Sequence, residues 1–193
     1  MKSKKKVFLT VLSAVVLVVG SVLGTMAYLT SKTDTVTNTF TAGNVNITLD
    51  EAKVDETGVP VEGAARVKAN DYKLIPGHNY TKDPTVHVTT GSEESWLFVK
   101  VVDQIAGIED DDTVAAQMAA KGWTAVAGAT NVYAYKTTVN AEEDIKVFDT
   151  FKVKSDAAVA DYAGKTITVE AYAVQADGFE TAAEAWNAAP AWN

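Results

Sequence analysis

The sequence predicts a mainly β fold, an antiparallel β-sandwich with two short helices, preceded by a signal-peptide helix. Three observations support this prediction. About seven short segments have the alternation or the β-branched content of strands. Turn residues separate these segments, as they do in a sandwich. The two helical patterns come late in the chain and do not alternate with the strands, which disfavours a parallel α/β sheet.

The first 27 residues have the three parts of a secretory signal peptide. Four lysines precede an apolar run, Val7–Leu23, and small residues follow at Gly24–Ala27. We expect a signal peptidase to cut between Ala27 and Tyr28, which makes the protein secreted. The alternative is an uncleaved membrane anchor. We favour cleavage because the apolar run has only 17 residues, near the minimum for a spanning helix, and no basic cluster follows it.

Removal of the signal leaves 166 residues, enough for one domain, and changes the formal net charge from −8 to −12. Such an acidic surface argues against nucleic acid and anionic lipid as partners. The chain contains no cysteine, which excludes disulfides, thiol catalysis and cysteine-based zinc sites. Stability must therefore come from a packed core.

An extended segment, residues 28–43, precedes the sandwich domain expected at residues 44–193. It is rich in threonine, contains no proline and has much β propensity. A strand with a free end can pair with its own sheet or with the open edge of another molecule. The alternatives are an ordinary first strand and a disordered tail. The residues expected to form a donor strand are Thr35, Val36, Thr37, Asn38, Thr39 and Phe40.

The domain is expected to begin with a half-buried strand at Asn44–Asp50, which alternates strictly between apolar and polar residues. Residues 54–69 have the glycines and proline of a loop. Extended structure resumes at Thr81–Thr89, where Pro84 marks a strand start or an edge. Trp96–Val102 is almost continuously apolar, as a central sandwich strand would be.

The first helix is expected to open at Asp110–Thr113, because acidic residues complement the positive end of the helix dipole, and to end at Lys121–Gly122. The second helix, Ala182–Ala189, starts from a capping box at Thr181–Glu184 and would dock on the sheet through Trp186. The remaining strands are expected at Trp123–Val126, Val132–Thr138, Ile145–Val153 and Lys165–Gln175.

The sequence contains no catalytic motif of the H-E-x-x-H, G-x-S-x-G or phosphate-loop type, so we do not expect an enzyme. We expect its histidines, His78 and His87, to be solvated rather than zinc ligands, because zinc takes more than two protein ligands. Carboxylates such as Asp110, Asp111 and Asp112 could ligate calcium. We favour the simpler interpretation that these acids only start a helix.

Four blocks of sequence carry a family resemblance: Gly24–Ala27, Tyr28–Leu49, Leu74–Pro84 and Ile167–Trp186. Together they resemble the TasA/camelysin family, exported proteins of Gram-positive bacteria whose signals are cut by a SipW-type signal peptidase. The resemblance implies a jelly-roll-like sandwich at the cell surface. In TasA-like members it further implies a biofilm matrix fibre subunit with accessory matrix proteins as partners. There the mature N-terminus is donated as a strand to the next subunit, which corresponds here to Tyr28 to about Phe40.

Three functions therefore stay open. The first is a secreted structural subunit that polymerises by N-terminal donor-strand exchange. The second is a monomeric surface binding module, with weak calcium binding as one form of it. The third is a camelysin-type metalloprotease, an activity that the resemblance implies but that no zinc motif supports. We rank the structural role first.

Overall fold

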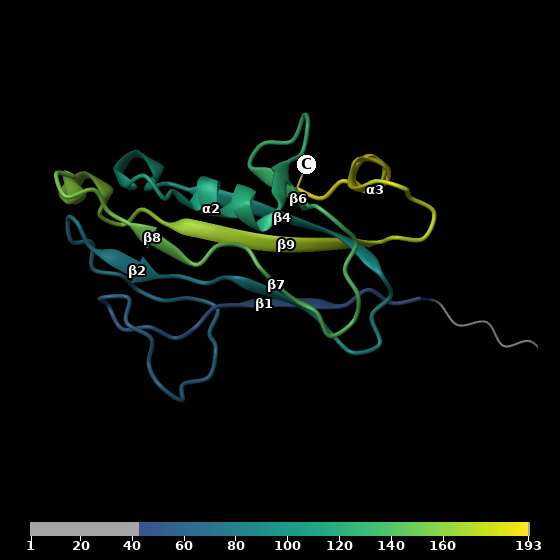
Figure 1. The fold of residues 1–193 in the computed structure, drawn as a ribbon, viewed down its shortest axis with the longest axis horizontal. Helices are drawn as coiled ribbons and strands as arrows, with labels where there is room; N and C mark the ends of the chain where they lie inside the picture. Colours follow the sequence, from purple (N-terminus) through teal and green to yellow (C-terminus); the bar gives the residue numbers. More distant parts are fainter. Residues whose placement is uncertain (1–42, 193) are drawn as a thin grey trace, which may run out of the picture. The chain divides into compact units, whose positions relative to one another are not determined.

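The computed structural model describes residues 43–192, and Figure 1 shows that this part of the chain is mainly β. Every strand pair in it is antiparallel and α-helices accompany the sheets, which confirms the predicted fold class. The signal peptide, the cleavage position between Ala27 and Tyr28 and the donor-strand residues Thr35–Phe40 lie outside the described residues. The jelly-roll connectivity implied by the resemblance stays a prediction.

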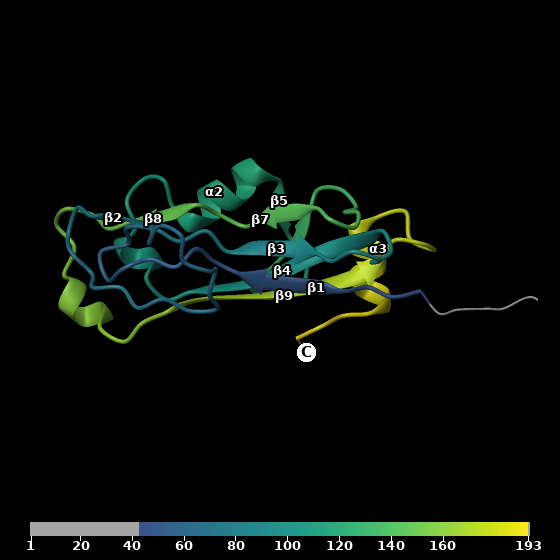
Figure 2. The ribbon, with the colours of Figure 1, turned by 90° about the horizontal axis from the view of Figure 1, so that it is seen from below.

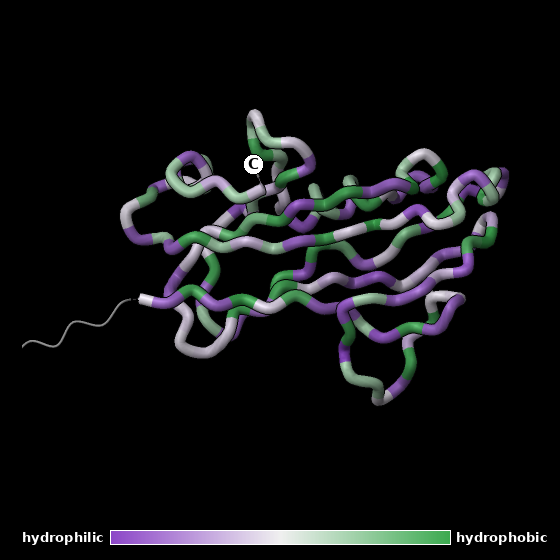
Figure 3. Tube along the Cα trace, turned by 180° about the vertical axis from the view of Figure 1, so that it is seen from behind, coloured by the Kyte–Doolittle hydropathy of each residue, from purple (hydrophilic) through white to green (hydrophobic). Residues whose placement is uncertain are grey.

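The elements follow the hydropathy pattern of the chain, and Figure 3 shows hydrophobic and hydrophilic residues alternating along the longer strands. The strands of the described part are β1 (Ile47–Asp50), β2 (Asn79–Thr81), β3 (Thr85–Val88), β4 (Ser95–Asp103), β5 (Trp123–Ala125), β6 (Val132–Tyr135), β7 (Asp144–Lys146), β8 (Thr150–Lys152) and β9 (Ile167–Gln175). The helices in the same range are η1 (Ala106–Ile108), α2 (Val114–Lys121), η2 (Val159–Tyr162) and α3 (Ala182–Ala188), of which η1 and η2 are 3-10 helices.

The strands form two layers. One layer is the sheet with strand order β5-β6-β4-β9, and the other contains β1-β3-β7. In Figure 1 the first layer lies above the second. Leu97 and Val99 of β4 and Val86 and Val88 of β3 are buried in one apolar cluster between them. Burial of this cluster is the main favourable term for the fold.

The predicted single strand Ile145–Val153 is wrong, because the structure divides it into β7 and β8. β7 pairs with β3, whereas β8 pairs with β2 in the same register. The interruption lies at Pro84, whose carbonyl accepts from the Val147 N–H at 2.8 Å. Proline has no N–H to return the bond, so the ladder breaks at this point. The predicted extended stretch Thr81–Thr89 is divided by the same residue.

Helix α2 begins after Thr113, whose hydroxyl oxygen accepts from the Ala116 N–H at 3.1 Å. Gly122 ends the helix with φ of +95°, as the sequence predicts for a C-terminal glycine. The prediction that Asp110–Asp112 form an acidic first turn is wrong. The helix begins at Val114, and its first turn contains no acid.

Helix α3 has the predicted capping box. The Thr181 hydroxyl oxygen accepts from the Glu184 N–H at 3.2 Å, and the Glu184 carboxylate accepts from the Thr181 N–H at 3.1 Å. Trp186 is 8% exposed and its ring centroid lies 5.3 Å from that of Phe98 on β4. This contact belongs to a second apolar cluster, separate from the main core. Trp186 therefore docks α3 on the sheet, as predicted.

The long connection between β1 and β2 contains only isolated bridges, in agreement with the predicted loop. The connection ends at β2, where Tyr80 is fully buried. The Tyr80 hydroxyl donates to the carbonyl of Lys73 at 2.6 Å and accepts from the Ile75 N–H at 2.7 Å. These bonds hold the end of the connection against the core.

Candidate functional site: an open strand edge

Strand β9 is a long edge strand. It pairs with β4 over all nine of its residues, and no other strand of the described part pairs with it. Its nine residues include one charged residue, Glu170, and no proline. Edge strands are usually short, charged or interrupted, because an exposed row of backbone groups invites another strand. β9 lacks these protections.

The ladder determines which backbone groups of β9 point outward. The Thr166 carbonyl accepts from the Gln104 N–H at 3.0 Å, and the Ala176 N–H donates to the Glu94 carbonyl at 2.8 Å. Antiparallel pairs alternate, so the even-numbered residues bond to β4 and the odd-numbered ones face away. Among residues 43–192, no hydrogen bond reaches the outward backbone groups of Ile167, Val169, Ala171 or Ala173.

Strand β1 presents a second, shorter edge beside β9. Asn46 and Thr89 pair through a bond of 3.0 Å, so Thr48 and Asp50 face β3 while Ile47 and Leu49 direct their backbone groups outward. Residue Glu51 closes this edge, because its N–H and carbonyl both bond to Val67 at 2.8 Å. In Figure 1, β1 runs below β9 on the same side of the sandwich. We call β9 and the adjoining part of β1 the open edge.

The core beneath the open edge is incompletely covered. The apolar side chains there that pack against the main core are only partly buried: Ile47, Leu49, Ile167, Val169, Ala171 and Ala173. Their counterparts on the central strands β3 and β4 are fully buried. An added strand with apolar residues on its inner face would remove this surface from water.

The opposite side of the sandwich is covered by α2, and Figure 2 shows this helix together with β5 and β7, away from β1 and β9. The Gln117 side chain of α2 donates to the Thr150 carbonyl at 3.0 Å and accepts from the N–H groups of Asp149 and Thr150 at 3.0 and 3.2 Å. The Trp123 indole N–H donates to the Lys146 carbonyl at 3.2 Å. The two sides therefore differ. On this side, side chains bond to backbone groups of Lys146, Asp149 and Thr150, whereas the outward groups of β9 have no such partner among residues 43–192.

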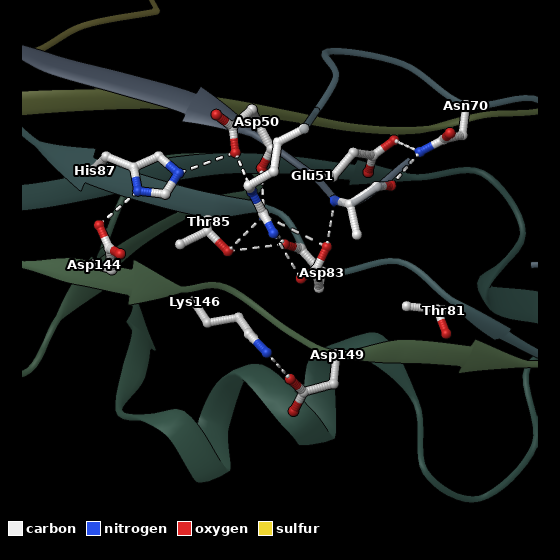
Figure 4. Close-up of polar contacts among 12 residues, drawn as sticks. Asp50, Glu51, Asn70, Thr81, Asp83, Thr85, His87, Asp144, Lys146 and Asp149 are labelled. Atoms are coloured by element: carbon white, nitrogen blue, oxygen red, sulfur yellow. Dashed lines mark hydrogen bonds and ion pairs between the residues drawn. The ribbon is translucent and has the colours of Figure 1, made fainter. Parts of the chain in front are cut away.

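A polar cluster on the outer face of the β1-β3-β7 sheet fixes the end of β1 (Figure 4). His87 of β3 lies between two carboxylates, with its Nε2 2.9 Å from Asp50 and its Nδ1 2.5 Å from Asp144. Carboxylates only accept hydrogen bonds, so the protonated imidazolium is the form that satisfies both contacts. The His87 side chain is 25% exposed, so it is half-exposed, and both carboxylates hold it in place.

Arg66 completes this cluster from the long loop. Its guanidinium contacts Asp50, lies 3.1 Å from the Asp83 carboxylate and donates to the Thr85 hydroxyl at 3.0 Å. Burial alone would raise the pKa of Asp50, but hydrogen bonds from Arg66 and His87 outweigh it and lower that pKa below its ordinary value. For His87, burial opposes protonation, yet the two carboxylates raise its pKa above the usual 6.5. The cluster therefore ties β1, β3, β7 and the loop together.

The other predicted site residues lie apart from one another. His78 is half-buried, with Nε2 2.8 Å from the Thr57 carbonyl and its ring at 4.6 Å from that of Tyr80. Asp110 pairs with Lys152 at 2.6 Å, and Asp111 and Asp112 are exposed. In the described part of the chain, no three His, Asp or Glu side chains are grouped as a metal ion would require. Zinc and calcium binding thus stay without structural support.

Comparison with known proteins identified no relative. No protein-family model, curated protein or solved structure matches the chain.

Among residues 43–192, no helix is long and apolar enough to cross a membrane. The alternation of β9 is visible in the sequence, but its position at an edge is not, because the order of strands in a sheet depends on long-range pairing.

Proposed function

We propose that the protein is a secreted structural subunit whose N-terminal segment, residues 28–43, adds as a strand to the open edge of a second copy. The observation that carries the proposal is β9, a nine-residue edge without proline or cation that lies over a partly covered core. The strand that occupies the edge is the chain's own leading segment, residues 28–43.

Length favours this occupant. The segment has 16 residues, which span about 50 Å when extended at about 3.3 Å per residue. The nine residues of β9 need about 30 Å of partner strand by the same measure. Each outward N–H and carbonyl of the odd-numbered β9 residues can then pair with the added backbone, which satisfies groups that otherwise rely on water.

The side-chain pattern of residues 28–43 also favours this segment as the strand added to the open edge. In the candidate donor strand, Val36 and Phe40 share one face and Thr35, Thr37 and Thr39 share the other. The apolar face would cover the partly buried row beneath the open edge, and the threonines would face water. Because the donated strand and the accepting edge are different surfaces, the contact is heterologous and repeats into a filament. The acidic charge of the subunit opposes assembly, so acidification or divalent cations should promote it.

Deletion of residues 28–39 tests the proposal. We expect the shortened exported protein to fold as a monomer and to form no fibres in electron micrographs, whereas the unshortened one assembles at high concentration. The matched control replaces the same residues with a Gly/Ser linker of equal length, which preserves chain length and removes the β pattern. Fibres that persist unchanged after the deletion would exclude strand donation by this segment.

Export and processing are part of the same proposal. We expect a SipW-type signal peptidase to release the chain, and sequencing of the exported protein should then begin at Tyr28. Accessory matrix proteins are candidate partners that share the open edge. In residues 43–192, no arrangement of side chains favours the calcium-binding or protease alternatives.

A further inference from the structure

A pocket of about 290 Å³ lies where β4 ends and α2 begins, away from the open edge. Its wall combines six apolar residues and one aromatic residue with two uncharged polar residues and two acids. The acids are Asp103, the last residue of β4, and Glu109, which follows η1. The wall also includes Val114, Met118 and Tyr133. Its volume is at the small end of ligand pockets, which suits a ligand the size of one side chain.

Glu109 is buried in an unusual way. It is 3% exposed, and one carboxylate oxygen, Oε2, accepts from the Val114 N–H at the start of α2 at 3.1 Å. The other oxygen, Oε1, is buried and has no hydrogen-bond partner in the described part of the chain. Buried carboxylate oxygens are normally paired, so this orphan atom calls for a donor.

The second acid stands next to it. Asp103 lines the same pocket as Glu109, and its carboxylate also accepts from the Ile105 N–H at 2.8 Å. Within residues 43–192, no lysine, arginine or histidine forms an ion pair with either group. Glu109 is buried and Asp103 is half-buried. Two such acids without a cation are costly, because one proton or one positive charge is missing.

We propose that this pocket binds a primary alkylammonium group, with the ammonium between Asp103 and Glu109 and the alkyl chain along Val114 and Met118. An ammonium has three donors, which matches the unpaired Glu109 oxygen and the neighbouring Asp103 carboxylate. The apolar side chains of Val114 and Met118 in the wall accept the methylene groups, and Tyr133 adds an aromatic surface. Calcium fits less well, since it takes six to eight oxygen ligands and only two carboxyl groups meet here.

Thermal melting of the exported protein at pH 8 tests the proposal, with n-butylamine hydrochloride as the probe and tetramethylammonium chloride at equal concentration as the control. Tetramethylammonium has the same charge but no N–H donor. We expect the melting temperature to rise by about 2–4 °C with butylamine at tenfold excess over its Kd, and not with the control. An equal rise with both salts, or none with butylamine, overturns the proposal.

Three variants test whether the rise in melting temperature with butylamine comes from binding in this pocket. Glu109→Gln keeps an acceptor for the Val114 N–H and gives Asp103 a donor, so it should fold and lose the butylamine response. Asp103→Asn should lose the response as well. Asp111→Asn removes one charge from an exposed position and should retain it. A full response in Glu109→Gln and Asp103→Asn would place the amine elsewhere and overturn the assignment.

A second probe distinguishes the two sources of such a group. Nα-acetyl-lysine methylamide carries the same ammonium on a polypeptide-like backbone. A response to both probes supports recognition of a lysine side chain from another protein, and a response to butylamine alone supports a small free amine. The site is independent of strand donation, so the assay gives the same answer for the variant that lacks residues 28–39.

Discussion

Asp50 on β1 lies diagonally across from His87 on β3, and the Asp50 carboxylate is 2.9 Å from His87 Nε2. Diagonal neighbours on one face of an antiparallel pair are within reach of long or aromatic side chains. Asp144 stands directly opposite His87 on β7 and takes the other ring nitrogen. One imidazole therefore connects three strands of the sheet that carries the N-terminal segment.

Replacing His87 with Gln should weaken this connection in a pH-dependent way. The pKa of His87 is raised in the folded protein, so protonation stabilises the fold below pH 6.5, and this contribution is lost as pH rises through the folded pKa. We expect the variant to lose about 1 kcal/mol of unfolding free energy at pH 5.5 and less at pH 8.5, measured by urea unfolding. His78→Gln is the control, because it removes a histidine whose ring nitrogen contacts the Thr57 carbonyl rather than a carboxylate. A loss that is equal at both pH values would contradict an imidazolium contact.

Replacing Glu109 with Gln should raise the stability of the fold, whereas replacing His87 with Gln lowers it. Burial, and then the nearby Asp103 charge, raise the pKa of Glu109 from 4.5 to about 7. The folded state therefore holds a proton that the unfolded state releases, and the stability from that proton is lost as pH rises through about 7. We expect Glu109→Gln to be about 1–3 kcal/mol more stable than the wild type at pH 8 and nearly equal at pH 4.5.

The pH dependence of the urea midpoint checks this second prediction. His87 acts in the same direction near neutral pH, so the comparison is best made in a His87→Gln background. A Glu109→Gln variant that is less stable than its parent at pH 8 would show that the ionised carboxylate is favoured in the fold, contrary to its burial.

Local patterns in the sequence predicted much of the fold. The strict alternation at β1 and β9, the apolar run of β4 and the capping box at Thr181 all act over a few residues, and the structure contains each of them. Gly122 and Trp186 also have their predicted roles. These features succeed because capping and periodicity depend on neighbours in the chain.

The features that could not be predicted from the sequence depend on contacts between residues far apart in the chain. His87 receives its carboxylates from residues 37 and 57 positions away, so its polar strand position alone could not reveal them. Glu109 belongs to an acidic run that suggests a solvated helix start, yet its side chain turns inward. Pro84 is a visible ladder breaker, but that it separates β7 from β8 follows only once β3 is known to pair with β7 and β2 with β8.

Gln117 should be among the polar side chains most important for stability. Its amide bonds to backbone groups of Asp112, Asp149 and Thr150, and it is buried. Gln117→Met keeps the volume but leaves these groups unpaired, which should cost about 2–3 kcal/mol in urea unfolding. The exposed Gln175→Met is the control and should cost little. A cost below about 0.5 kcal/mol for Gln117→Met would show that water replaces the amide at this side of the sandwich.

The alternation of β9 makes a pair of proline substitutions informative. The Ala171 N–H points outward, so Ala171→Pro removes no bond to β4 and should leave a folded monomer with a blocked edge. The neighbouring Glu170 N–H bonds to β4, so Glu170→Pro should break the ladder and destabilise the fold by about 3 kcal/mol. Circular dichroism melting compares the two. Equal destabilisation would mean that the odd-numbered groups of β9 are not the outward ones.

The Ala171→Pro subunit keeps its N-terminal segment and loses its accepting edge, whereas the subunit that lacks residues 28–39 keeps the edge and loses the segment. Neither should polymerise alone. Mixed together, each pair can make one strand contact and no further one, so light scattering after gel filtration should detect a 1:1 heterodimer and no longer species. Added to unshortened protein, Ala171→Pro should stop filament growth at one end, because it donates a strand but accepts none. Fibres that incorporate it throughout would show that strands are added somewhere other than β9.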